Sequence, residues 1–137
     1  GRPAIWVLPV VFPLLMALGG FAGLVGWDLP AIEVGIALSA VVLGGLILGQ
    51  ARLPLAIAIL IVAVFAVFHG HAHGTEMAPD QDAMLYSIGF VVATGLLHAA
   101  GIVLGLIHRW DTGRVVLRAA GSVVLAGGLY FLWGAVA

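Results

Sequence analysis

The chain has 137 residues, of which 64% are hydrophobic and 8% are charged, with 5 basic and 6 acidic side chains. A soluble globular domain carries about 25% charged residues, so the composition excludes a soluble fold and predicts an all-α, polytopic bundle of transmembrane helices. The near-neutral charge, with no basic patch, excludes nucleic acid as a partner. The absence of cysteine excludes disulfides, zinc–thiolate sites and iron–sulfur clusters.

Apolar segments long enough to cross a bilayer, which takes about 20 helical residues, recur along the chain. The predicted spans are Ala4–Val25, Pro30–Gln50, Leu53–His69, Ala83–His108 and Val115–Val136. Pro9 and Pro13 fall inside the first span and predict a kink or a later start. Pro30 and Pro54 are expected in the first turns of their helices, where proline is tolerated. Residues 1–137 are therefore expected to form a single transmembrane domain.

The charged residues sort between the two ends of these spans. Arg2, Arg52, Arg109, Arg114 and Arg118 fall on one side. Asp28, Glu33, Glu76, Asp80 and Asp82 fall on the other side, and only Asp111 breaks the pattern. The positive-inside rule predicts that the arginine side is cytoplasmic. The histidine-rich segment and the C-terminus are then expected to be periplasmic.

An odd number of spans with a cytoplasmic start is unusual for a whole protein. The sequence begins Gly-Arg-Pro, with no initiator methionine. We expect the chain to be a fragment of a longer protein with a further helix before Gly1.

Glycine pairs four residues apart occur inside the spans, where they let a neighbouring backbone approach closely. The pairs are Gly19 and Gly23, Gly45 and Gly49, and Gly101 and Gly105. Close packing within one bundle is the favoured interpretation, and contacts in a homo-oligomer are the alternative.

Three histidines and a glutamate follow the third span, at His69, His71, His73 and Glu76. Neutral imidazole is a common ligand of Zn, Cu, Ni and Co, so the run predicts a site for a divalent transition metal. We expect this run to be a loop, although its geometry is left open. In a helix His69 and His73 would share a face that His71 does not, whereas in an extended chain all three would share a side. Glu76 is a candidate oxygen ligand or partner of an imidazole.

Further polar residues occur within or beside the apolar spans. His98 lies deep in the fourth span and is a candidate metal ligand, because an ionisable residue inside a membrane is costly without a partner. The alternative is a neutral histidine bonded to a carbonyl of a neighbouring helix. Thr94, one turn away, is a candidate partner or path residue. Glu33 and Asp28, at the outer end of the second span, are candidates for the mouth of an ion path or for surface carboxylates.

The run Phe68–Glu76, the pattern Tyr86-x-x-Gly89-Phe90-x-x-Ala93-Thr94-x-x-x-His98-x-x-Gly101 and the segment Glu33-x-Gly35-Ile36-Ala37-x-Ser39 together resemble the HupE/UreJ family of nickel and cobalt permeases. The resemblance covers essentially the whole chain. It implies a six-helix protein of the bacterial inner membrane, found beside hydrogenase or urease genes. It also supports His69, His71, His73, Glu76 and His98 as ligand candidates. The family's metal-binding HPxxGxDH motif, on its first helix, is absent here.

The function predicted from these features is secondary transport, or facilitated uptake, of Ni²⁺ or Co²⁺ into the cytoplasm. Zn²⁺ is an alternative cargo because it binds the same ligand types. The chain contains no nucleotide-binding loop, and we expect no organic cofactor. One alternative function is a metal-binding or metal-sensing accessory subunit for metalloenzyme assembly. An intramembrane zinc hydrolase is disfavoured because no HExxH run is present, so we expect no enzyme activity.

Overall fold

The structure is a computed structural model that describes residues 2–137. Gly1 lies outside the described residues, as does the side chain of Arg2, one of the arginines assigned above to the basic side. The helices are α1 (Arg2–Leu24), α2 (Ile32–Leu48), α3 (Leu55–Glu76), α4 (Ala83–Gly105) and α5 (Asp111–Val136), with a 3-10 turn, η1 (Leu106–Arg109), after α4. The predicted all-α fold is confirmed, since residues 2–137 contain no strand.

Four of the helical segments are long and apolar enough to cross a membrane, and together they confirm the membrane bundle. These segments are α1, α3, α4 with η1, and α5. The second helix, α2, has 17 residues, which is near the lower limit of about 17–25 residues for a spanning helix. It is shorter than the predicted span at both of its ends.

Left-handed residues account for the shorter α2. Ala31, with φ of 55°, separates Pro30 from the helix, so Pro30 lies before the first turn and not within it as predicted. At the other end Gln50 has φ of 50°. The N–H of Ala51 donates to the carbonyl of Leu46 at 2.9 Å, a bond that closes the end of a helix. Pro54 also lies just outside its helix, since it is the extended residue immediately before α3.

The histidine-rich run is helical, so the prediction of a loop after His69 was wrong. The third helix continues through all three histidines and ends at Glu76. Glycine in a helix costs about 1 kcal/mol relative to alanine, but Gly70 and Gly74 pack against the backbone of α1. A Cβ atom at Gly70 would overlap the main chain of Met16, and one at Gly74 would overlap that of Gly20. This close contact between helices favours the helical conformation over the loop.

The fifth helix also begins earlier than predicted, at Asp111 instead of Val115. The N–H of Arg114 donates to the carbonyl of Trp110 at 2.9 Å, and its guanidinium pairs with the carboxylate of Asp111. The acidic residue in the first turn also favours helix formation, because the N-terminus of a helix carries partial positive charge.

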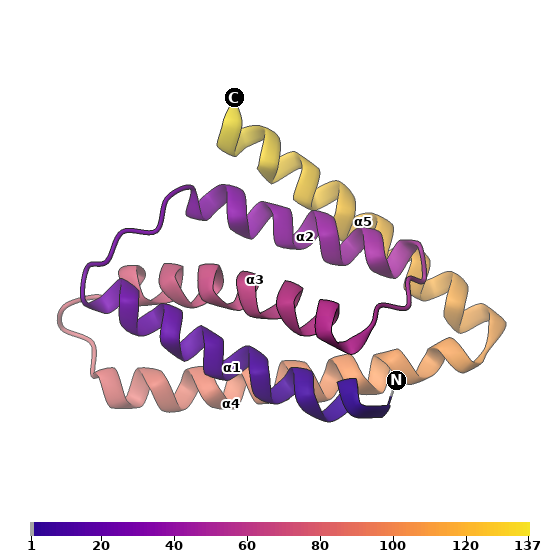
Figure 1. Ribbon diagram of the computed structural model, residues 1–137, viewed down its shortest axis with the longest axis horizontal. Helices are drawn as coiled ribbons and strands as arrows, with labels where there is room; N and C mark the ends of the chain where they lie inside the picture. The colour runs from indigo at the N-terminus through magenta and orange to yellow at the C-terminus, as the bar shows by residue number, and fades with distance from the viewer. Residues whose placement is uncertain (1) are drawn as a thin grey trace. The chain divides into compact units, whose positions relative to one another are not determined.

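The chain forms two compact units, each described here by itself. The first contains α1, α3 and α4 as far as Ile102. In this unit α1 and α3 lie side by side (Figure 1). They run parallel, because Met16 lies against Gly70 and Gly20 lies one turn further along against Gly74. The residues that follow α1, including Asp28, therefore lie at the same end of this unit as Glu76.

The second unit contains α2, η1 and α5, and here α2 and α5 are the neighbours (Figure 1). They run antiparallel, since Gly121 lies near Leu48 and Gly128 lies near Val41. Arg118 donates from Nε to the carbonyl of Leu48 at 3.0 Å. Within this unit the arginines of early α5 therefore lie at the end of α2 that precedes Arg52, as the charge pattern predicts.

Only one of the three predicted glycine pairs makes a close contact between helices within the described residues. Side chains at Gly19 and Gly23 would overlap the main chain of α3. Gly45, Gly101 and Gly105 have nothing within 4 Å of an added Cβ, and Gly49 meets only the carbonyl of Gly45 in its own helix. Packing within the bundle therefore explains the first pair alone.

Candidate metal site

Helical geometry divides the three clustered histidines between two faces of α3. His69 and His73, four residues apart, line a cavity of about 700 Å³ in the first unit together with residues of α1 and α4. His71 is not among the residues that line it. Of the two arrangements that the sequence left open, the structure therefore has the helical one, in which His69 and His73 share a face.

His98 lines the same cavity from α4. Its Nδ1–H donates to the carbonyl of Thr94, one turn earlier in the same helix, at 2.8 Å. This hydrogen bond fixes the hydrogen of the neutral ring on Nδ1 and leaves the lone pair of Nε2 as the ligand atom. The ring packs on Phe12 of α1, with 5.1 Å between ring centroids. The carbonyl bond expected for a neutral histidine is thus present, but it comes from the histidine's own helix.

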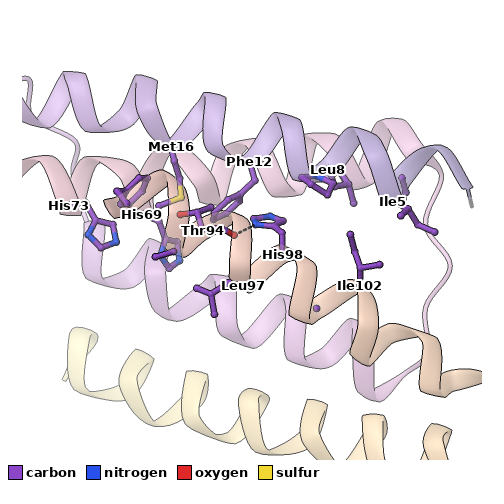
Figure 2. A pocket seen from close by; sticks show the side chains of 15 residues that line it. Ile5, Leu8, Phe12, Met16, His69, His73, Thr94, Leu97, His98 and Ile102 are labelled. Atoms are coloured by element: carbon purple, nitrogen blue, oxygen red, sulfur yellow. Dashed lines mark hydrogen bonds between the residues drawn. The ribbon is translucent and has the colours of Figure 1, made fainter. Parts of the chain in front are cut away.

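The three imidazoles follow one another along the cavity. Figure 2 shows His73, His69 and His98 in succession, with the dashed bond from His98 to Thr94. His73 lies near the end of α3, and His98 faces Phe12, which is one turn before Met16 in α1. Apolar residues make up most of the remaining wall, including Leu8, Leu97 and Ile102. The cavity can therefore offer imidazole nitrogens as ligands at three successive positions along its length, while most of its wall is apolar.

His73 stands where two cavities meet. A second cavity, of about 200 Å³, lies between α1, α3 and α4, and it shares Met16, His73 and Phe90 with the larger one. The Nδ1 atom of His73 lies 3.2 Å from the hydroxyl of Tyr86. Its ring meets Phe90 edge to face, at 5.0 Å between centroids and an interplanar angle of 73°. His73 is therefore held on two sides by residues of α4.

One face of α4 carries Tyr86 and Phe90, which contact His73, and Thr94, which bonds His98. Its members recur at every fourth residue: Tyr86, Phe90, Thr94, His98 and Ile102. All of them line one or both cavities. Sequence reasoning assigned roles to His98 and Thr94 and missed the roles of the two aromatic residues, although the four-residue spacing places all five on one helix face.

His71 is buried on the other face of α3, with 4% of its surface exposed. Its Nε2–H donates to the main-chain carbonyl of Trp27 at 2.5 Å, and its Nδ1 is buried without a hydrogen-bond partner. A carbonyl partner for one ring nitrogen is common among metal-bound histidines. Within residues 2–137, however, His71 belongs to no group of three candidate ligands.

The carboxylates lie apart from the larger cavity. Glu76 is exposed at the end of α3, and Asp28 is exposed after α1. Glu33 lines a separate cavity of about 430 Å³ in the second unit, with Ala37 and Phe131 among its neighbours. Ser39, which belongs to the same sequence pattern as Glu33, is buried and donates to the carbonyl of Ile36 at 2.6 Å.

The described part of the chain contains no ready-made coordination sphere. Across residues 2–137, no three histidine, aspartate or glutamate side chains lie close enough together to hold one metal ion. The predicted ligands therefore fall into a set of three imidazoles spread along one cavity, and two residues outside that cavity, His71 and Glu76.

The fold and this cavity define a class of protein: a multi-span helical membrane protein with histidines lining a cavity between its helices. The chain belongs to the HupE/UreJ family, whose model, described as HupE / UreJ protein, matches residues 1–131. It is also similar to Protein HupE of Rhizobium leguminosarum bv. viciae. The two are 39% identical over 134 residues, which is 98% of this chain and 70% of the relative. No solved structure matches the chain.

Proposed function

We propose that this protein is a secondary transporter or facilitator that carries Ni²⁺ or Co²⁺ from the periplasm to the cytoplasm across a bacterial inner membrane. The observation that carries the proposal is the succession of His73, His69 and His98 along one cavity of about 700 Å³. Nickel or cobalt is favoured as cargo because the chain belongs to the HupE/UreJ family.

Capture of the ion is assigned to His73 and His69. Two histidines four residues apart on one helix face can bind a single divalent ion, as in the HExxH metal motif. Glu76, exposed one turn beyond His73, is proposed to attract the hydrated cation to this end of the unit. Water completes the coordination, which suits an ion that must be released again.

Transfer into the membrane is assigned to His98. The apolar wall of the cavity offers no replacement for the hydration shell of a divalent ion, and stripping that shell is costly. A bare Nε2 at His98 supplies a ligand at the depth where water is scarce. Thr94 contributes the carbonyl that keeps this nitrogen free of hydrogen. Because the three imidazoles are spread along the cavity and do not surround one point, the arrangement favours passage of an ion over its storage.

The orientation proposed for the chain follows the charge pattern. Glu76 and Asp28 are assigned to the periplasmic side, and Arg52, Arg109, Arg114 and Arg118 to the cytoplasmic side. The parallel packing of α1 with α3 and the antiparallel packing of α2 with α5 support this sorting within each unit, because residues of like charge lie at one end.

Uptake of radioactive nickel into proteoliposomes tests the proposal. The purified protein should carry ⁶³Ni²⁺ into vesicles above the level of empty liposomes, and the double variant His69→Gln, His73→Gln should not. The matched control is His108→Gln, because His108 is exposed in η1 outside the cavity. Nickel binding without uptake by the unmodified protein would instead favour an accessory subunit that holds or senses metal.

A further inference from the structure

The phenol of Tyr86 holds one of the two ring nitrogens of His73. The Nδ1–Oη distance is 3.2 Å, and the two residues come from different helices, 13 residues apart. The Tyr86 ring lies nearly parallel to that of Phe90, at 6.3 Å between centroids and 20° between planes. Phe90 in turn packs against the His73 ring in a T-shaped arrangement. The phenol is therefore fixed by α4 at the point where the imidazole borders both cavities.

The hydrogen bond between Nδ1 of His73 and the phenol of Tyr86 determines which ring nitrogen can bind an ion. With Nδ1 facing the phenol, Nε2 is the nitrogen left for a cation in the cavity. The edge-to-face contact with Phe90 opposes a rotation of the ring that would exchange the two nitrogens, because the packed ring occupies that space. We propose that Tyr86 is the positioning residue of His73: it directs Nε2 to the metal ion, and its phenol oxygen then accepts a hydrogen bond from the Nδ1–H of His73. This inference rests on the proposed function.

A hydroxyl suits a ligand that binds its ion reversibly, because a hydroxyl both donates and accepts hydrogen bonds. Without metal, the phenol can donate to Nδ1, and the ring hydrogen is then on Nε2. When a cation binds Nε2, that nitrogen releases its proton to water and Nδ1 takes one up, so the net charge of the ring is unchanged. Nδ1–H now donates to the phenol oxygen. The imidazole has a hydrogen-bond partner in both states.

His98 differs in this respect. Its Nδ1 faces a main-chain carbonyl, which only accepts, so the neutral ring has its hydrogen on Nδ1 and a free lone pair on Nε2 both with and without metal. His73 is thus an adjustable ligand at the junction of the two cavities, and His98 is a permanent one deeper inside. An ion that moves from His73 to His98 leaves a ligand whose ring hydrogen must change nitrogen. It reaches a ligand whose Nε2 already has a free lone pair.

Nickel affinity measured by calorimetry on the purified, detergent-solubilised protein tests the inference. Removal of a hydrogen-bond partner of a metal-bound histidine typically costs 10- to 100-fold in affinity, so Tyr86→Phe should weaken Ni²⁺ binding by about tenfold or more. Tyr130→Phe is the matched control, because Tyr130 is exposed on α5 in the second unit. It should bind as tightly as the unmodified protein.

A double-variant comparison separates positioning from general destabilisation. In a His73→Gln background, Tyr86→Phe should cause no further loss of affinity, because the ligand that it positions is gone. In a His69→Gln background it should still weaken binding. Equal losses in both backgrounds would overturn the positioning role, since they would show that Tyr86 acts on something other than His73.

The tautomer of His73 gives a readout on the unmodified protein. With ¹⁵N-labelled histidine and Zn²⁺ as a diamagnetic probe, the His73 nitrogen shifts should show metal at Nε2 and a hydrogen at Nδ1. Metal at Nδ1 would overturn the inference. The two proposals fail separately. Normal affinity in His73→Gln contradicts the proposed metal path, whereas reduced affinity there with normal affinity in Tyr86→Phe contradicts only the role of Tyr86.

Discussion

The imidazole of His71 joins the end of α3 to the segment after α1, through a hydrogen bond of 2.5 Å from its Nε2–H to the carbonyl of Trp27. This contact lies on the opposite side of α3 from the cavity that His69 and His73 line. The three histidines of one short run therefore make different contacts, and His71 supports the packing of α1 on α3.

Replacement of His71 should reduce stability more than metal binding. His71→Ala removes the hydrogen bond to the Trp27 carbonyl and opens a void in a buried position, and the hydrogen bond alone contributes about 0.5–1.5 kcal/mol. We expect a lower melting temperature in detergent and an unchanged affinity for Ni²⁺. His108→Ala, at an exposed site, is the control and should affect neither. A large loss of nickel affinity at an unchanged melting temperature would instead make His71 a ligand.

The glycines of the histidine-rich run should be intolerant of side chains. Gly70→Ala forces a methyl group into the main chain of Met16, and overpacking of this kind costs about 1–3 kcal/mol. Gly95→Ala is the matched change on α4, where an added Cβ meets nothing within 4 Å. Thermal unfolding in detergent should show a lower melting temperature for the first variant alone. Equal stability of the two would contradict the close packing of α1 on α3.

Local sequence patterns predicted the helices well and the histidine-rich run poorly. Hydrophobic length alone located all five segments, because lipid requires continuous apolar helices. The run from His69 to Glu76 was predicted to be a loop because Gly70 and Gly74 weaken a helix locally. Their contact with α1 outweighs that preference, and it depends on residues about 54 positions earlier in the chain.

The sequence predicted only part of the candidate site, because the rest depends on contacts between helices. Imidazole chemistry singled out His69, His73 and His98, and helical spacing separated His71 from the first two once the run was known to be helical. The role of Tyr86 needed the turn between α3 and α4, which brings its hydroxyl to His73. No local pattern encodes that contact.

The orientation of the chain is tested by single cysteines in this cysteine-free sequence. Asp80→Cys should react with a membrane-impermeant thiol reagent in intact cells, and Thr112→Cys should react only after the membrane is permeabilised. Thr112 is exposed and is preferred to Gly113, where a side chain would overlap the main chain of Ile107. The reverse labelling pattern would show that the arginine side faces the periplasm.

His98 should be required for transport and not for capture. His98→Gln retains a polar side chain of similar size, but an amide is a much weaker ligand for divalent transition metals than imidazole. We expect nickel uptake into proteoliposomes to fall to background while calorimetry still detects binding at His69 and His73. His108→Gln is a close control, because the Nδ1 of His108 also bonds a carbonyl of its own segment, that of Gly105, at 2.7 Å. Normal uptake by the His98 variant would make that residue structural.

Filling the larger cavity should block the ion without removing a ligand. Ala93 lines this cavity from α4, so Ala93→Leu adds three carbon atoms to the space between the imidazoles and the apolar wall. Ala99 is exposed on the same helix and outside both cavities, and Ala99→Leu is the matched control. The added atoms occupy space that the ion would cross, so nickel uptake should fall in the first variant and stay normal in the second. If Ala93→Leu transports nickel as well as Ala99→Leu does, the ion does not pass through this cavity.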